Sequence, residues 1–115
     1  MHIPQQAVRL RIFTGESDKF EGRLLYKVVV EEARQQGLAG ATVLRGLMGY
    51  GANSRVHAST ILRLSEDLPL IIEIVDAPGK IEKFLAFLDQ RLVEGLVTVE
   101  PVEVRFYRHF NGEKR

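Results

Sequence analysis

The stretch that decides the fold is Leu70-Ile71-Ile72-Glu73-Ile74-Val75, which is apolar apart from Glu73 and rich in β-branched residues. A short and nearly continuous apolar run is typical of a central strand that is covered on at least one face. Ser65-Glu66-Asp67-Leu68-Pro69 precedes it and indicates a turn or bulge after an earlier strand-like run at 60–64. The stretch therefore predicts the middle of a β-sheet.

A helix is predicted directly after this strand. Asp76 is a candidate N-cap residue, because its side chain could accept a hydrogen bond from the first turn. Apolar residues then recur at the spacing of one helical face: Ile81, Phe84, Leu85, Leu88 and Leu92. Gly95 closes the region.

The N-terminal half shows the same order of elements. Val8, Leu10 and Ile12 alternate with arginines and predict a strand over about 7–13. One apolar face predicts a helix over about 22–36, which Gly37 ends as a C′ residue. A short β-branched run at 41–45 predicts the second strand.

The last strand is predicted over Leu96 to Tyr107. Pro101 cannot donate a hydrogen bond to a neighbouring strand, so this strand should lie at a sheet edge or carry a bulge there. The resulting βαββαβ order, with right-handed crossovers, predicts an α+β ferredoxin-like sandwich. Its four-stranded antiparallel sheet would have the order 4-1-3-2, with two helices on one face. We expect a single domain over 1–115, with a core at about 7–107 and exposed edges that favour an oligomer.

Composition limits the function. The chain has no cysteine, which excludes disulfides, thiolate zinc sites and cysteine nucleophiles. Its net charge of +1 gives no overall footprint for nucleic acid, so no nucleic-acid partner is expected. We see neither a secretory signal nor an apolar run long enough to span a bilayer, and we expect a cytoplasmic protein.

The loop after the second strand holds the candidate ligand site. It runs from Arg45 to His57, with glycines at 46, 49 and 51 and a further arginine at 55. The sequence contains no acidic residue from Ala33 to Ser65. Glycine amides and arginines can cradle an anion, but the spacing matches neither the Walker A nor the dinucleotide pattern. A structural turn is the alternative interpretation.

Other polar residues carry weaker signals. His57 is either a surface histidine or a base or ligand, and Glu73 is expected to pair with Arg45 or Arg63. The entrance of the second helix, Asp76 to Lys80, is either an N-cap or an anion site. The loop from Gly15 to Lys19 is interpreted as a solvated connection. No catalytic motif and no metal site is recognised, so a binding protein is favoured over a hydrolase that uses His57 and Glu73.

Several motifs together resemble a family. They are Gly37-Leu38-Ala39-Gly40-Ala41-Thr42-Val43-Leu44-Arg45-Gly46, Gly49-Tyr50-Gly51, Leu62-Arg63-Leu64-Ser65-Glu66-Asp67-Leu68-Pro69 and Ile72-Glu73-Ile74-Val75-Asp76. Over about residues 7–107 the chain resembles an uncharacterised conserved prokaryotic family classed as PII-like, which is related in fold to the PII nitrogen-regulatory signalling proteins.

This resemblance implies a regulatory homotrimer that is not an enzyme. It implies an adenine nucleotide, bound in clefts between subunits, as the ligand and no firm cofactor. A protein target, such as a membrane transporter or channel, would contact the loop between strands two and three. Carried over by position, the ligand-binding candidates are Arg45, Gly46, Gly49, Tyr50, Gly51, Arg55 and His57. The alternative is an interaction module that docks on its target without a ligand.

The chain also departs from the PII pattern. Its loop is shorter than the PII regulatory loop, and Tyr50 matches the modified tyrosine of that loop in position alone. Arg91-Leu92-Val93-Glu94-Gly95, with a single glycine, stands where PII proteins have a glycine-rich phosphate loop.

Overall fold

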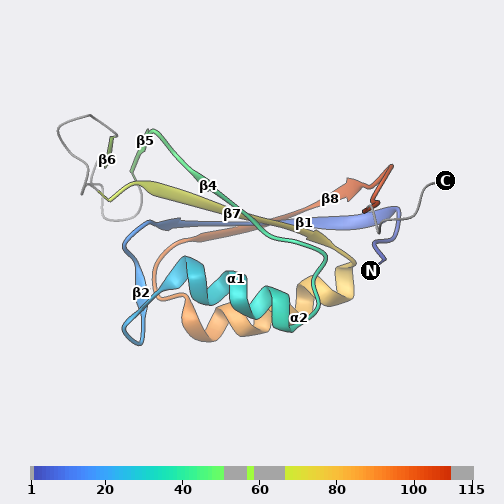
Figure 1. Cartoon of the computed structure of the whole chain (residues 1–115), viewed down its shortest axis with the longest axis horizontal. Helices are drawn as coiled ribbons and strands as arrows, with labels where there is room; N and C mark the ends of the chain where they lie inside the picture. The colour runs from blue at the N-terminus through green and yellow to red at the C-terminus, as the bar shows by residue number, and fades with distance from the viewer. Residues whose placement is uncertain (1, 51–56, 59–66, 110–115) are drawn as a thin grey trace.

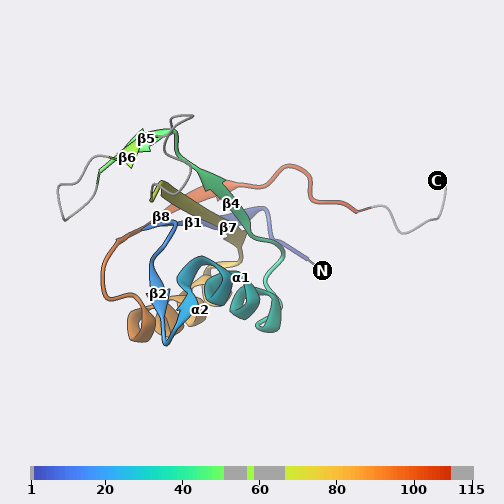
Figure 2. The same cartoon turned by 60° about the vertical axis from the view of Figure 1, so that its left-hand side comes forward.

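The computed structural model describes residues 2–50, 57–58 and 67–109. Within these residues the chain forms a four-stranded antiparallel sheet with two helices on one face (Figure 1). The sheet consists of β1 (Gln6–Gly15), β4 (Thr42–Arg45), β7 (Pro69–Asp76) and β8 (Leu96–Glu103). The helices are α1 (Leu25–Gln35) and α2 (Pro78–Arg91), which lie side by side beneath it in both views (Figure 2).

The strands of the main sheet lie in the order β4-β7-β1-β8. Counting these four strands along the chain, the order read from β8 is 4-1-3-2. The structure adds two short hairpins that the sequence analysis did not predict. One pairs β2 (Lys19–Phe20) with β3 (Arg23–Leu24), and the other pairs β5 (Met48–Gly49) with β6 (His57–Ala58). The architecture is therefore ferredoxin-like, with additions at one end of the sheet.

The core lies between the sheet and the helices. β7 pairs with β1 on one side and β4 on the other, so the stretch 70–75 is central, as predicted. Alternate residues of the two central strands point toward the helices, because side chains alternate along a strand. Among the described residues, the fully buried apolar side chains are all core positions of strands or helices: Leu10, Ile12, Ile72, Ile74, Val29, Ile81 and Phe84.

Helix α1 begins later than predicted. Glu21 and Gly22 have φ values of 50° and 81°, which close the β2–β3 hairpin, so the helix starts at Leu25 rather than at about residue 22. Its end agrees with the prediction. Gly37 has a φ of 77°, and Leu38 N–H donates to the Ala33 carbonyl over 3.0 Å, as in a Schellman motif.

Asp76 is not the N-cap of α2. Ala77 occupies that position without a side-chain hydrogen bond, and Pro78 starts the helix. Asp76 is fully buried, where its Oδ1 accepts from Ala77 N–H over 2.7 Å and its Oδ2 from Ala39 N–H over 2.9 Å. The prediction was wrong because this carboxylate joins the end of β7 to the segment that follows α1.

The last strand is shorter than predicted but lies where Pro101 requires. β8 ends at Glu103, and Tyr107 instead donates its hydroxyl to the Ala39 carbonyl over 3.0 Å. Within the described chain β8 pairs with β1 alone, so Pro101 sits in an edge strand. In the part of the chain that the structure describes, no helix is both long and apolar enough to cross a membrane.

Gly95 gives a direct test of this fold. It has a φ of 144°, and an added Cβ would lie 2.8 Å from the Phe13 carbonyl oxygen. We expect Gly95→Ala to lower the free energy of unfolding by about 2 kcal/mol, because the backbone is strained and the clash involves main chain. Gly79→Ala is the matched control, since nothing lies within 4 Å of its added Cβ. Urea denaturation should show a loss for the first variant and no loss for the second.

Candidate functional site

The predicted ligand loop starts where β4 meets β7, and it projects from one end of the sheet (Figure 1). Gly46 N–H donates to the Pro69 carbonyl over 2.7 Å. An added Cβ on Gly46 would lie 2.8 Å from Pro69 Cγ, and one on Gly49 would lie 3.3 Å from the same atom. These glycines therefore let the loop pass close to Pro69, which supports the structural alternative for both of them.

The described part of the loop is a short ribbon. Met48 pairs with Ala58 and Gly49 with His57. Leu47, Met48 and Tyr50 are strongly exposed. The candidates Gly51 and Arg55 lie outside the described residues, as do Arg63 and the predicted strand at 60–64. The remaining candidates, Arg45, Gly46, Gly49, Tyr50 and His57, are described, and the β5–β6 pairing places His57 opposite Gly49.

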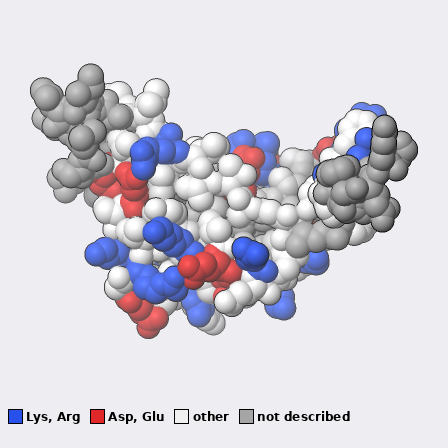
Figure 3. Space-filling model, in the orientation of Figure 1, with Lys and Arg blue, Asp and Glu red and all other residues white. Residues whose placement is uncertain are grey.

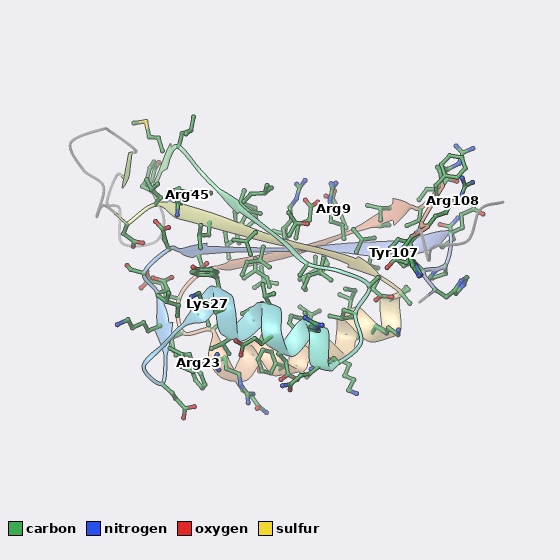
Figure 4. All side chains as sticks on the ribbon, viewed as in Figure 1. Arg9, Arg23, Lys27, Arg45, Tyr107 and Arg108 are labelled. Atoms are coloured by element: carbon green, nitrogen blue, oxygen red, sulfur yellow. The ribbon has the colours of Figure 1, made fainter. Side chains whose placement is uncertain are left out.

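Arg45 has an acidic partner that the sequence did not reveal. Its guanidinium forms a hydrogen-bonded ion pair with the Glu16 carboxylate, while 62% of the Arg45 side chain stays exposed (Figure 4). Glu16 follows β1, and its N–H donates to the Leu68 carbonyl over 2.8 Å. Antiparallel pairing of β1 with β7 brings the two segments together. The run without acids at 33–65 therefore does not make an acid-free surface.

The loop after β1 lies beside the ligand loop and contacts it through Glu16, so it is more than a solvated connection. Asp18 Oδ2 accepts from Gly15 N–H over 2.8 Å, and Asp67 Oδ1 accepts from Ser17 N–H over 2.7 Å. These carboxylates fix the turn that presents Glu16. Among the described residues no group of three or more His, Cys, Asp or Glu side chains is arranged to hold a metal ion.

Glu73 forms the expected structural pair, but with a different arginine. Its Oε2 lies 2.8 Å from Arg11 Nε, directly across from it on β1, rather than beside Arg45. Arg9 and Glu100 form a second ion pair on the same face of the sheet, the face that the helices leave uncovered. The hydrogen bond from Arg9, helped by the charges of Arg9 and Arg11 and opposed by desolvation, lowers the pKa of Glu100. Glu73 is thus part of a cross-strand charge network, because Arg11 also lies 3.9 Å from the Glu100 carboxylate. Among the described residues, the ion-pair partner of Glu73 lies outside the loop that carries His57.

At the entrance of α2, the N-cap residue Ala77 makes no side-chain hydrogen bond, and no described residue caps the first turn with a side chain. Lys80 Nζ is directed to the Gly37 carbonyl at 3.5 Å, and the buried Asp76 carboxylate occupies the end of β7. Cationic side chains instead mark the end of the domain near Arg45, where Lys27 and Arg23 lie below it (Figure 4). Blue surface is prominent on this face in Figure 3. Arg23 is paired with Glu31 at 2.6 Å.

The described residues define the fold class as a ferredoxin-like sandwich with a loop between its second and third long strands. Comparison with solved structures agrees on the fold. The CPII protein of Thiomonas intermedia K12, in a structure bound to ADP and bicarbonate, aligns with a TM-score of 0.55 and 19% identity. The alignment covers 86% of this chain and 88% of that one.

The chain belongs to the family DUF190, described as Uncharacterized ACR, whose model matches residues 7–104. A UPF0166 protein of Aquifex aeolicus is 42% identical over 95 residues, covering 83% of this chain and 90% of the relative. A UPF0166 protein of Methanocaldococcus jannaschii is 45% identical over 76 residues, covering 66% of this chain and 69% of the relative. The resemblance to an uncharacterised PII-like family is thereby confirmed.

Proposed function

We propose that this chain is a non-enzymatic, cytoplasmic regulatory protein of the PII-like class. It binds a small anionic ligand, an adenine nucleotide, in clefts between its subunits and signals through the loop between β4 and β7. The observation that carries the proposal is the largely exposed Arg45 guanidinium at the base of that loop. The shared fold with a protein whose structure contains ADP gives the ligand class its support.

The chemistry at Arg45 suits a phosphate group. A guanidinium offers several N–H donors in a plane, which match two phosphate oxygens at once. In the described structure its partner is the carboxylate of Glu16, an anion of similar geometry. A phosphate would therefore compete with Glu16 for the same donors, and binding would release the turn after β1 from the loop.

The open face of the sheet supports an assembly of subunits, proposed here as a homotrimer. The helices cover one face only, and the other face leaves Leu44 and Leu96 about half exposed. β4 and β8 are edge strands, and exposed edges favour pairing or burial in an oligomer. Contacts between copies would cover this apolar surface and form the clefts in which the nucleotide binds.

Calorimetry tests the ligand class. The protein is titrated with ADP, ATP, AMP, GDP and inorganic phosphate at low ionic strength. The proposal expects saturable binding of at least one adenine nucleotide, stronger than that of GDP and phosphate. An absence of heat at millimolar concentrations of all adenine nucleotides would rule it out.

Glu16 should act as an internal competitor of the ligand. Glu16→Gln keeps the shape of the side chain and removes its charge, so Arg45 loses a charged partner. We expect this variant to bind the nucleotide about two- to fivefold more tightly, since exposed ion pairs contribute up to about 1 kcal/mol. Glu31→Gln, which uncouples the exposed Arg23–Glu31 pair, is the control. An unchanged affinity in Glu16→Gln would mean that the pair does not oppose binding.

A second candidate function rests on the apolar side chains of the loop. Leu47 and Tyr50 are 80% and 72% exposed, and such side chains are enriched at protein interfaces. The loop could therefore dock on a target protein without any ligand. Capture of the same target with and without nucleotide, and its loss in Leu47→Ser/Tyr50→Ser, would favour this interaction module.

A further inference from the structure

A groove runs between helix α2 and the edge strand β8. Its volume is about 470 Å³. Its apolar lining comes from α2 and the residue that follows it, with one residue from β8: Leu85, Ala86, Leu88, Leu92 and Val97. Two acids, Glu82 and Asp89, also line it, and they lie on one helical face because they are seven residues apart. The groove thus combines apolar and acidic side chains.

In the described part of the molecule, no cationic side chain pairs with the two carboxylates of this groove. β8 has no further strand beyond it, and neither Glu82 nor Asp89 forms an ion pair with a described residue. Apolar surface flanked by unpaired carboxylates is complementary to a segment that combines an aromatic ring with positive charge.

The segment that follows β8 has this composition. We call residues 104–109 the C-terminal arm. Arg105 and Arg108 make it basic, although Arg105 also lies 3.7 Å from the Glu103 carboxylate, and the Phe106 side chain is 75% exposed. Arg108 Cζ lies 4.6 Å from the centre of the Phe106 ring, so ring and charge form one unit. Figure 2 shows the arm leading away from the body of the domain.

The arm of the same molecule is held away from its own groove. Val97 lies at the start of β8, whereas the arm follows its end at Glu103. Six residues of extended strand separate these two points by about 20 Å. Tyr107 also binds the Ala39 carbonyl, which keeps the arm near the segment after α1.

We propose that the groove between α2 and β8 binds the C-terminal arm of a second copy of this chain. Phe106 of one copy packs on Leu85 and Val97 of the other, and Arg108 lies against Glu82 and Asp89. This contact joins two different surfaces, so repeated use closes a ring or extends a chain of copies. The inference rests on the oligomer in the proposed function and names one of its contacts, but it does not depend on the nucleotide.

Engineered cysteines test the contact, because the chain contains none of its own. Ala86→Cys protein is mixed with Phe106→Cys protein of different mass and oxidised with diamide. We expect a disulfide-linked heterodimer, seen without reductant and lost with it. Lys27→Cys, on α1 far along the chain from the groove, replaces Ala86→Cys in the control. No heterodimer, or the same amount with the control, would overturn the proposal.

Two further measurements separate the alternatives. An Ala86→Cys/Phe106→Cys double variant that cross-links within one chain would show that the arm folds onto its own groove, which also overturns the proposal. In sedimentation velocity, Arg108→Glu should weaken self-association about tenfold, and Asp89→Arg in the same chain should restore it. Calorimetry with ADP on these variants reports separately on the nucleotide site. Lost cross-linking with retained ADP binding would reject this contact alone, and retained cross-linking without ADP binding would reject the proposed ligand alone.

Discussion

Arg45→Ala is expected to weaken the binding of an adenine nucleotide by about 10- to 100-fold. Hydrogen bonds to a charged group contribute about 1.5–3 kcal/mol, and the guanidinium of Arg45 is the exposed charged donor at the base of the loop. Its removal should leave the fold unchanged, because the side chain is largely in solvent. Isothermal titration of ADP into both proteins measures the change.

Arg23→Ala is the matched control for this experiment. Arg23 is also an exposed arginine with one glutamate partner, Glu31, but it lies in the β2–β3 hairpin. Its loss should change the nucleotide affinity by less than twofold, because Arg23 lies outside the ligand loop and moderate salt screens exposed charges. Equal losses in the two variants would show that general charge, rather than the position of Arg45, attracts the ligand.

Asp76→Ala is expected to lower the free energy of unfolding by about 3 kcal/mol. The substitution leaves two partly buried backbone N–H groups, those of Ala39 and Ala77, without their acceptor. Each buried donor left unpaired costs about 1–3 kcal/mol. Chemical denaturation followed by circular dichroism measures the difference.

Two further variants make the result specific to this carboxylate. Asp76→Asn retains one acceptor oxygen and should recover part of the loss. Asp18→Ala removes an acceptor that serves one backbone N–H, that of Gly15, and should cost less than Asp76→Ala. If Asp76→Ala were as stable as the native chain, the bond between β7 and the segment after α1 would contribute nothing.

Much of the fold was predictable because it depends on local patterns. The apolar run at 70–75 and the stripe from Ile81 to Leu92 each bury one face, so their periodicity survives in the folded chain. Gly37 and Pro101 were informative for a related reason, since glycine is favoured where φ is positive and proline cannot donate a backbone hydrogen bond. The position of the loop followed from the order of the elements.

Most of the errors come from contacts between distant segments, and one comes from a local hairpin. Asp76 has the composition of an N-cap, yet its partner Ala39 lies 37 residues away along the chain. Glu73 pairs with Arg11, and Arg45 with Glu16, because antiparallel strands set these neighbours. The β2–β3 hairpin depends on the positive φ of Glu21, which no sequence pattern signals.

The candidate site was only partly predictable for the same reason. The sequence identified one loop and its glycines, whereas Glu16, the partner of Arg45, lies in the segment that follows the end of β1. Gly46 was singled out for ligand contact, and the structure shows that it also lets the loop pass Pro69.

The most direct test of the central claim is a titration of ¹⁵N-labelled protein with ADP, followed by NMR of backbone amides and arginine Nε–H groups. The proposed function predicts saturable shifts of Arg45 Nε–H and of the amides of Gly46 and Glu16, while Gly79 at the start of α2 stays unchanged. Shifts confined to residues away from the loop, or no shifts at millimolar ADP, would contradict it.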